Sequence, residues 1–317
     1  MVPPESGIAE LGGERARMRK PDFFIVGAPK CGTTSLNDYL QVHPEIFIPA
    51  KKEIHFFGSD LPFLKGTRVT EQEYMAYFAP ARDEKCVGEA SVWYLYSRQA
   101  AAEIKAFTPT ARIIIMLRNP VDMMYSLHSQ RLYNDNENIP NFEEALAAET
   151  ERKQGKQLYQ NASDVMGSLY RAAATYTPQV QRYLEVFGRE RVHIIIFDDF
   201  ARATPEAYRR TCEFLEVNPD FQPEFQIINA NKGVQSKALR SLLRYPPWPL
   251  RWLFRLVGLR PARQGFKGWL RRLNTRYEPR ALMDPELRRR LQAEFAPEVE
   301  RLSALLGRDL TSWCRPR

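Results

Sequence analysis

The sequence has little of what several classes of protein require. Four cysteines are spread over 317 residues without metal-ligand spacing, so we expect reduced thiols and no metal site. No uninterrupted apolar run approaches the roughly 20 residues of a membrane-spanning helix. Residues 1–20 contain charges, glycine and proline but no apolar core, which predicts a disordered leader and not a secretory signal. A cytoplasmic protein is therefore expected, with peripheral contact at the inner face of a membrane left open.

Acidic residues are absent from one stretch of the chain, residues 237–277, which holds eleven Lys and Arg residues. Without this stretch the chain has 35 basic and 38 acidic residues, so the stretch accounts for the whole net charge of +8. It also contains Trp248, Trp252 and Trp269. We predict a basic, mostly helical insertion that contacts a membrane surface or a polyanion. Two other interpretations stay open, namely stacking on single-stranded nucleic acid, although no nucleic-acid motif is present, and a solvated helical lid.

Strand-like and helix-like segments alternate along the chain, which predicts a parallel sheet with crossover helices. Buried strands are expected at 23–26, 112–117 and 192–197, with shorter ones at 45–48 and 86–88. Helices are expected at about 33–42, 74–78, 97–107, 120–131, 169–187 and 205–215. A last helix is expected to begin after an N-cap at Asp284 and to end at Gly307. The pattern predicts one α/β domain over residues 21–317.

The most informative segment joins the first strand to the first helix. Gly27 and Gly32 have the spacing of the phosphate-binding loop G-x-x-x-x-G-K-[ST], but Thr33 stands where that motif has its lysine. The only lysine of the segment lies inside the loop, at Lys30. The first helical turn supplies three hydroxyls, those of Thr33, Thr34 and Ser35. Backbone N–H groups and a helix N-terminus converge at such a loop, so it predicts a phosphate site without a lysine for a β- or γ-phosphate. Without a ligand, the same pattern is an ordinary strand–helix turn.

A second site of the same kind follows the central strand at 112–117. The strand ends at Arg118, Pro120 starts the next helix, and Ser126 lies eight residues after the arginine. A guanidinium, a helix N-terminal region and a hydroxyl again converge on one point, which favours an anion. Two such sites after two core strands predict a ligand with two separate phosphate groups, which the resemblance described next implies are the 5′- and 3′-phosphates of a nucleotide. Taken alone, Arg118 could equally cap the strand through an ion pair.

The two sites resemble those of sulfotransferases that use 3′-phosphoadenosine-5′-phosphosulfate (PAPS). Three further segments are similar to the same family, above all to its heparan-type and related bacterial members: Lys-Glu-Ile-His-Phe-Phe at 52–57, Asn-Lys-Gly at 231–233, and the segment 307–313 after the last helix. The resemblance covers residues 21 to the C-terminus. It implies a P-loop-like sulfotransferase fold, in which helices flank a central parallel sheet.

The resemblance also implies roles for individual residues. The 5′-phosphosulfate of PAPS would be bound by Lys30, Gly32, Thr33, Thr34 and Ser35. The 3′-phosphate would be bound by Arg118 and Ser126, and Lys232 with Gly233 would close over the donor. Tyr170 would contact the adenine side of the donor or pack in the core. The product of the donor would be 3′-phosphoadenosine-5′-phosphate (PAP).

Sulfonate transfer is an in-line displacement that needs a base on one side of the sulfur and a cation on the other. Lys30 would stabilise the leaving oxygen, and Glu53 resembles the family carboxylate that acts as base. His55 is the competing base, because an imidazole titrates near neutral pH. No metal is expected, since the donor has no β/γ-diphosphate to bridge. Ala90 stands where heparan-type members carry a lysine, so Lys30 would need help from Lys52 or Lys232.

The acceptor is the least determined part of the prediction. A hydroxyl of a carbohydrate or glycolipid is the first choice, and a lipid, a polyketide or a small phenol stays open. Two other functions stay open as alternatives. One is a P-loop nucleotide kinase, and the other is a non-enzymatic protein that binds nucleic acid or a polyanion. The missing lysine at Thr33 argues against the kinase.

Overall fold

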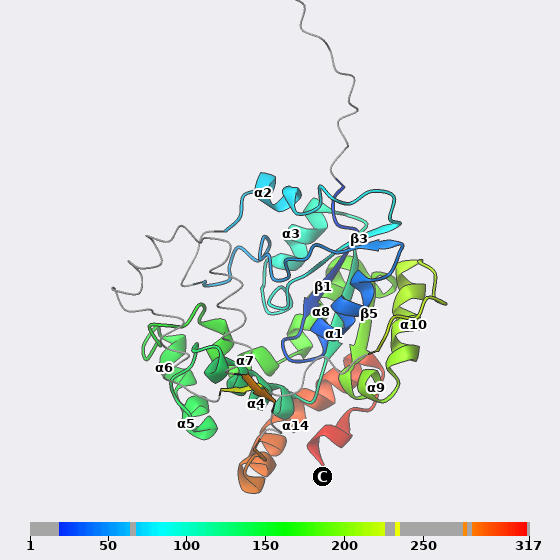
Figure 1. The fold of residues 1–317 in the computed structure, drawn as a ribbon. Helices are drawn as coiled ribbons and strands as arrows, with labels where there is room; N and C mark the ends of the chain where they lie inside the picture. The colour runs from blue at the N-terminus through cyan, green and yellow to red at the C-terminus, as the bar shows by residue number, and fades with distance from the viewer. Residues whose placement is uncertain (1–18, 64–67, 226–231, 235–274, 278–280, 316–317) are drawn as a thin grey trace, which may run out of the picture.

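The computed structural model describes residues 19–63, 68–225, 232–234, 275–277 and 281–315. Its central sheet has five strands: β1 (Phe23–Gly27), β2 (Ile46–Phe47), β3 (Cys86–Ala90), β4 (Arg112–Leu117) and β5 (Val192–Ile196). They lie in the order β2-β3-β1-β4-β5, and every pairing is parallel (Figure 1). Parallel neighbours need long crossovers, which the intervening helices supply. The predicted α/β class with a parallel sheet is confirmed.

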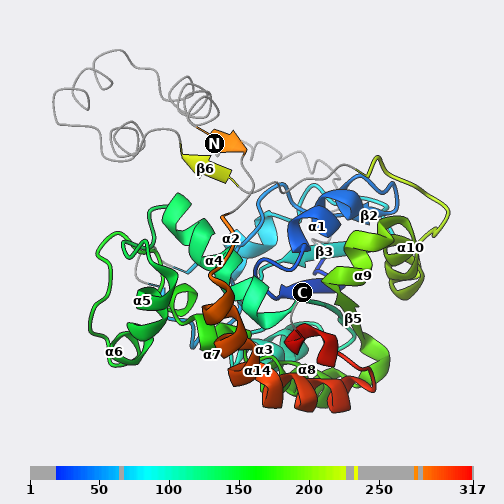
Figure 2. The same cartoon turned by 90° about the horizontal axis from the view of Figure 1, so that it is seen from below.

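Helices cover both faces of this sheet. The helices on one side are α1 (Thr33–Gln41), α9 (Phe197–Arg202) and α10 (Thr204–Leu215). Those on the other side are α3 (Ala100–Phe107), α8 (Thr177–Phe187) and α14 (Pro285–Leu306). Figure 2 shows the two layers with the sheet between them. The strands are accordingly buried on both faces: all five residues of β1 and residues 113–117 of β4 are buried. This is why the sequence reads there as continuous apolar runs.

Several helix ends follow the signals in the sequence. Helix α4 (Pro120–Tyr133) starts with Pro120 at its first turn, and the Asn119 side chain accepts hydrogen bonds from two N–H groups of that turn. Asp284 caps α14 by accepting from the Leu287 N–H, and Gly307 ends it with φ 63 in the left-handed region. The predicted caps of the last helix are confirmed.

The structure corrects two helix predictions and one strand prediction. The expected helix at 169–187 is two helices, α7 (Tyr170–Ala174) and α8, because Pro178 in the first turn of α8 has no N–H to continue the earlier ladder. The helix expected at 74–78 is α2 (Glu71–Ala76), which starts earlier because Thr70 and Glu73 form a capping box. The strand expected to include Phe197 ends at Ile196, and Phe197 starts α9.

A group of short helices extends beside α4, formed by α5 (Phe142–Ala147), α6 (Glu149–Lys153) and α7 (Figure 1). A separate two-stranded antiparallel ribbon pairs β6 (Lys232–Val234) with β7 (Thr275–Tyr277), and β6 lies against α4. Most of the predicted basic insertion at 237–277 lies outside the described residues. Its last three residues form β7, a strand where a helical insertion was predicted. The extent of the domain, the leader and the insertion stay predictions.

Candidate active site

The loop after β1 builds the N-terminus of α1 at the carboxyl edge of the sheet. The Ala28 N–H donates to the Met116 carbonyl of β4 at 2.7 Å, which fixes the start of the loop. Lys30 and Gly32 have φ values of 62° and 92°, in the left-handed region. A Cβ on Gly32 would lie 3.1 Å from the Phe197 ring, so glycine is required here for space as well as for conformation. The N-cap residue of α1 is Gly32, which has no side chain to accept hydrogen bonds from the first-turn N–H groups, and this suits the turn to an anion.

Lys52 brings a cation to the same helix turn. Its Nζ donates to the hydroxyls of Thr34 at 3.0 Å and Thr33 at 3.3 Å. The same Nζ lies 4.0 Å from Oε1 of Glu53, and the Lys52 side chain is 20% exposed. Burial lowers the pKa of Lys52, while the nearby Glu53 carboxylate opposes that shift. Lys52 therefore stands between the anion-binding turn and the predicted base.

Arg118 reaches the loop from the end of β4. Its Nη1 donates to the Lys30 carbonyl at 3.5 Å, and its guanidinium lies 4.7 Å from the centre of the Phe197 ring. Ser126 is buried in the second turn of α4, the helix that begins two residues after Arg118. The backbone of Lys232 and Gly233 belongs to β6, which lies against α4. The structure thus brings Arg118 against the loop that carries Lys30, and it places Ser126 on α4 and the backbone of Lys232 and Gly233 beside that helix.

The segment 52–57 runs along the carboxyl end of β3. The Glu53 N–H donates to the Ala90 carbonyl at 2.9 Å, and the Val92 N–H donates to Oε2 of Glu53 at 3.1 Å. In an extended segment, alternation would place Glu53 and His55 on the same side. Both instead have left-handed backbone, with φ 59° and 58°. Their side chains still meet, with His55 Nε2 3.6 Å from Oε2 of Glu53.

The surroundings of the two candidate bases move their pKa values in opposite directions. Burial raises the pKa of Glu53 to about 7, although Lys52 and the Val92 N–H both favour its charged form. Burial lowers the pKa of His55 to about 4, so its imidazole is neutral at neutral pH. Its Nδ1 is buried with no hydrogen-bond partner in the described part of the chain. Glu53 is therefore the group that titrates where a general base is most effective.

Glu89 is a site residue that the sequence analysis missed. It is 2% exposed near the carboxyl end of β3, and its carboxylate accepts hydrogen bonds from the hydroxyls of Ser91, Tyr74 and Tyr94. A carboxylate within an otherwise apolar buried strand is the signal that could have found it, because charged residues are almost never fully buried unless they are paired.

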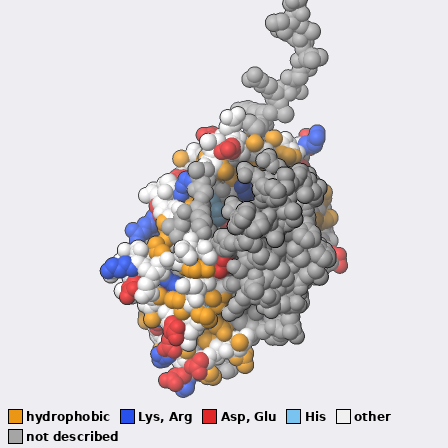
Figure 3. Space-filling model, turned by 60° about the vertical axis from the view of Figure 1, so that its left-hand side comes forward, with side chains coloured by type: hydrophobic (Ala, Val, Ile, Leu, Met, Phe, Trp, Pro, Cys, Tyr) orange, Lys and Arg blue, Asp and Glu red, His pale blue; other side chains and the backbone are white. Residues whose placement is uncertain are grey.

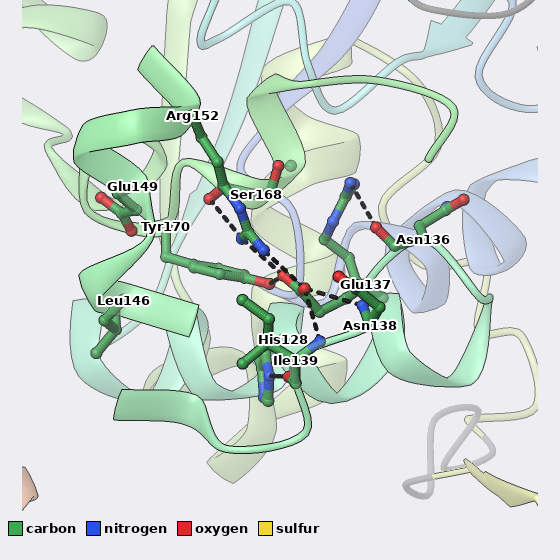
Figure 4. Close-up of polar contacts among 12 residues, drawn as sticks. His128, Asn136, Glu137, Asn138, Ile139, Leu146, Glu149, Arg152, Ser168 and Tyr170 are labelled. Atoms are coloured by element: carbon green, nitrogen blue, oxygen red, sulfur yellow. Dashed lines mark hydrogen bonds and ion pairs between the residues drawn. The ribbon is translucent and has the colours of Figure 1, made fainter. Parts of the chain in front are cut away.

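Tyr170 lies in a different environment from the one suggested for a donor contact. It is fully buried, and its hydroxyl donates to Oε2 of Glu137 at 2.8 Å. Glu137 also forms a buried ion pair with Arg152 at 2.7 Å (Figure 4). Burial and the neighbouring Glu137 carboxylate raise the pKa of Tyr170. Tyr170 is thus packed in the core against Glu137, and a contact with the donor stays a prediction.

Comparisons with known proteins agree with this geometry. Residues 20–237 match the sulfotransferase domain family. The chain belongs to the sulfotransferase family. A solved sulfotransferase from Alicyclobacillus acidocaldarius is 36% identical with a TM-score of 0.71, and the match covers 94% of this chain and 100% of that one. The predicted family, its fold and its class of enzyme, a transferase, are confirmed.

Relatives among characterised sulfotransferases are longer than this chain. Carbohydrate sulfotransferase 15 from Homo sapiens is 25% identical over 296 residues, which cover 77% of this chain and 52% of the human protein. The chain therefore spans about half the length of that relative.

The predicted cytoplasmic location is wrong, because it is contradicted by the relatives of this chain. A membrane-associated sulfotransferase from Dictyostelium discoideum, kil1, is 33% identical over 106 residues, 33% of this chain and 22% of that protein. Within the residues that the structure describes, no helix combines the length and the apolar character needed to cross a bilayer.

Proposed function

We propose that this sulfotransferase moves the sulfonate group of PAPS to a hydroxyl group of a carbohydrate or glycolipid acceptor. One observation supports this proposal above all. The N-terminus of α1, whose N-cap Gly32 has no capping side chain, lies with Lys52 and Glu53 at one edge of the sheet, and Lys52 Nζ is 4.0 Å from the Glu53 carboxylate. A base with a pKa of about 7 beside an anion site is the arrangement that in-line transfer requires. The carbohydrate class is supported by the human relative, a carbohydrate sulfotransferase.

The donor would lie between the loop after β1 and the end of β4. The first turn of α1, with the hydroxyls of Thr33, Thr34 and Ser35, would hold the 5′-phosphosulfate. Arg118 and Ser126 would hold the 3′-phosphate, and the β6 residues Lys232 and Gly233 would close over the donor. The 3′-phosphate is what would distinguish this donor from adenosine 5′-phosphate.

The reaction then needs one proton transfer and one exchange of bonds at sulfur. The acceptor oxygen forms a bond to sulfur as Glu53 takes the hydroxyl proton. The bond from sulfur to the bridging oxygen breaks, and PAP leaves with the electron pair. Lys30 stabilises the charge on that oxygen, and Lys52 supplies the positive field that Ala90 does not. His55 is too weak a base at neutral pH, with a pKa near 4, to compete with Glu53.

The two alternative functions have less support. Family membership disfavours the nucleotide kinase, which also lacks its lysine at Thr33. For a nucleic-acid binder, a single-sign patch is expected. On the face shown in Figure 3, the described basic and acidic side chains are interspersed. The basic segment that suggested the binder lies mostly outside the described residues.

Donor recognition can be tested by thermal shift with PAP and with adenosine 5′-phosphate. We expect much stronger stabilisation by PAP, because ligand affinity adds to the stability of the folded state. Arg118→Ala should lower PAP affinity about 10- to 100-fold, since a hydrogen bond to a charged group contributes about 1.5–3 kcal/mol. Arg112→Ala is the matched control, because Arg112 begins the same strand and pairs with Glu216 at the far end.

Equal stabilisation of the wild type by both nucleotides would contradict the proposed donor. The acceptor requires a separate assay, in which sulfonate transfer from labelled PAPS is measured over a panel of carbohydrates, glycolipids, lipids and phenols. Transfer to a phenol or lipid but to no carbohydrate would move the acceptor class while leaving the donor assignment intact.

A further inference from the structure

The carboxylate of Glu89 is the centre of a buried hydrogen-bond network under the segment 52–57. Its Oε1 accepts from Ser91 Oγ at 2.7 Å and from the Tyr94 hydroxyl at 2.9 Å. Its Oε2 accepts from the Tyr74 hydroxyl at 2.7 Å. Ser91 and Tyr94 are fully buried along with the carboxylate, so none of these bonds is exchanged for water at low cost.

Burial raises the pKa of Glu89, while the three hydroxyl hydrogen bonds favour its charged form. Backbone N–H groups can only donate hydrogen bonds and the carboxylate accepts them, which fixes the direction of the network. The hydroxyls of Ser91 and Tyr94 must each point their hydrogen at Glu89, which leaves their oxygens to accept. Ser91 Oγ accepts the His55 N–H at 3.3 Å. The Tyr94 oxygen accepts the N–H groups of Phe56 at 2.9 Å and Phe57 at 3.3 Å. Three consecutive N–H groups of the segment are thus held by one carboxylate through two hydroxyls.

This anchoring matters because the segment has a backbone that ordinary residues avoid. Glu53 and His55 both lie in the left-handed region, where a side chain crowds the backbone. Such a conformation persists only where the surroundings fix it, and it often marks a functional site. The ring of Phe56 also stacks on Tyr74 with 4.2 Å between centroids, so the same neighbours fix the segment through their rings.

We propose that Glu89 is a positioning residue for sulfonate transfer, which sets the place of Glu53 through Ser91, Tyr94 and the backbone of residues 55–57. The inference rests on the proposed function in one respect, namely that Glu53 is the base. Glu89 itself does not touch the donor or the acceptor in this scheme. It determines whether the Glu53 carboxylate lies where the acceptor hydroxyl must lose its proton.

The test compares two buried tyrosines that bind the same carboxylate. Tyr94→Phe keeps the ring but removes the oxygen that accepts the Phe56 and Phe57 N–H groups. Tyr74→Phe removes an equal bond to Glu89, and in the described residues the Tyr74 hydroxyl makes no bond to the backbone of segment 52–57. We expect Tyr94→Phe to lower kcat about 10- to 100-fold, the cost of a small misplacement of a reacting group. Tyr74→Phe should keep kcat within about threefold on the same reasoning.

The affinity for PAP should stay within about twofold in both variants, because the network does not enter the donor loop. Ser91→Ala removes the acceptor of the His55 N–H and should lower kcat by a similar factor to Tyr94→Phe. If Tyr94→Phe does not fold, the kcat of Ser91→Ala alone tests the proposal. The proposal is overturned if both Tyr94→Phe and Ser91→Ala keep kcat within about threefold, or if Tyr74→Phe loses as much as they do.

Hydrogen exchange separates this inference from the proposed function. The amides of residues 55–57 should exchange faster in Tyr94→Phe than in Tyr74→Phe, whether or not the acceptor is known. An inactive wild type with this exchange pattern would refute the proposed reaction and leave the anchoring by Glu89 in place. Equal exchange in the two variants would refute the anchoring itself.

Discussion

Replacing Glu53 by glutamine should remove activity and at the same time stabilise the fold. Burial raises the pKa of Glu53 from 4.5 to about 7. At about 1.4 kcal/mol per pKa unit, this difference corresponds to about 3 kcal/mol against the charged carboxylate in the folded state. The side chain is 31% exposed, so solvent screening reduces the expected effect to about 1–3 kcal/mol.

The sign of the pH dependence follows from when each state loses its proton. Below the ordinary pKa of 4.5, Glu53 is protonated in both the folded and the unfolded chain. Between 4.5 and about 7 the unfolded chain releases this proton while the folded protein keeps it, so the stability contributed by Glu53 is lost as pH rises. Glutamine has no proton to lose. The free energy of unfolding of Glu53→Gln minus that of the wild type should therefore grow from about pH 4.5 to about pH 8.

The activity of the wild type should rise over the pH range in which the stability contributed by Glu53 is lost. The wild-type kcat/KM should rise with pH through about 7, where Glu53 becomes the charged base. Glu53→Gln should lose this rise and lower kcat about 10²–10⁴-fold, while PAP affinity stays close to wild type. The measurements are denaturant unfolding across pH, a pH–rate profile and PAP thermal shift. A stability difference that stays flat with pH would refute the raised pKa. An active Glu53→Gln beside an inactive His55→Ala would move the base to His55.

Two further predictions concern the loop after β1. Lys30→Ala should lower kcat by a larger factor than it lowers PAP affinity, because its contact strengthens as the leaving oxygen gains charge; equal losses in both would place Lys30 in ground-state binding. Gly32→Ala should destabilise the fold by about 1–2 kcal/mol and weaken PAP binding, because the new Cβ meets Phe197 at a φ of 92°. Gly155→Ala is its control in urea unfolding and PAP titration, since Gly155 also has positive φ, at 76°, but nothing within 4 Å of its Cβ.

The parts of the fold that the sequence predicted are those specified by local signals. Strand β1 and residues 113–117 of β4 are apolar because both faces of these strands are covered, and the ends of α14 carry Asp284 and Gly307. The loop after β1 was predictable for the same reason, since its glycine and hydroxyl residues lie within a few positions of one another. The family resemblance added the roles of Arg118 and Glu53, which local patterns alone do not specify.

What the sequence could not predict depends on contacts between distant residues. Glu53 and His55 meet through two left-handed residues, a conformation for which neither residue type gives a signal. Glu89 accepts hydrogen bonds from Tyr74, Ser91 and Tyr94, which come together only after β3 is placed in the sheet. The buried contact of Tyr170 was equally hidden, because its partner Glu137 lies 33 positions away in the chain.

The order of the strands explains why the two anion-binding motifs meet. From β1 the chain moves to β2 and β3 on one side of the sheet, and it then returns to β4 and β5 on the other. The connections after β1 and after β4 therefore leave neighbouring strands in opposite directions, which is the arrangement that opens a crevice at the carboxyl edge of a parallel sheet. Lys30 lies at the end of one strand and Arg118 at the end of the other, 3.5 Å apart through the Lys30 carbonyl. Since β3 lies on the other side of β1, its end brings Glu53 to the same edge, bound to the Ala90 carbonyl. The places of the proposed donor site and of the proposed base beside it thus follow from one strand order.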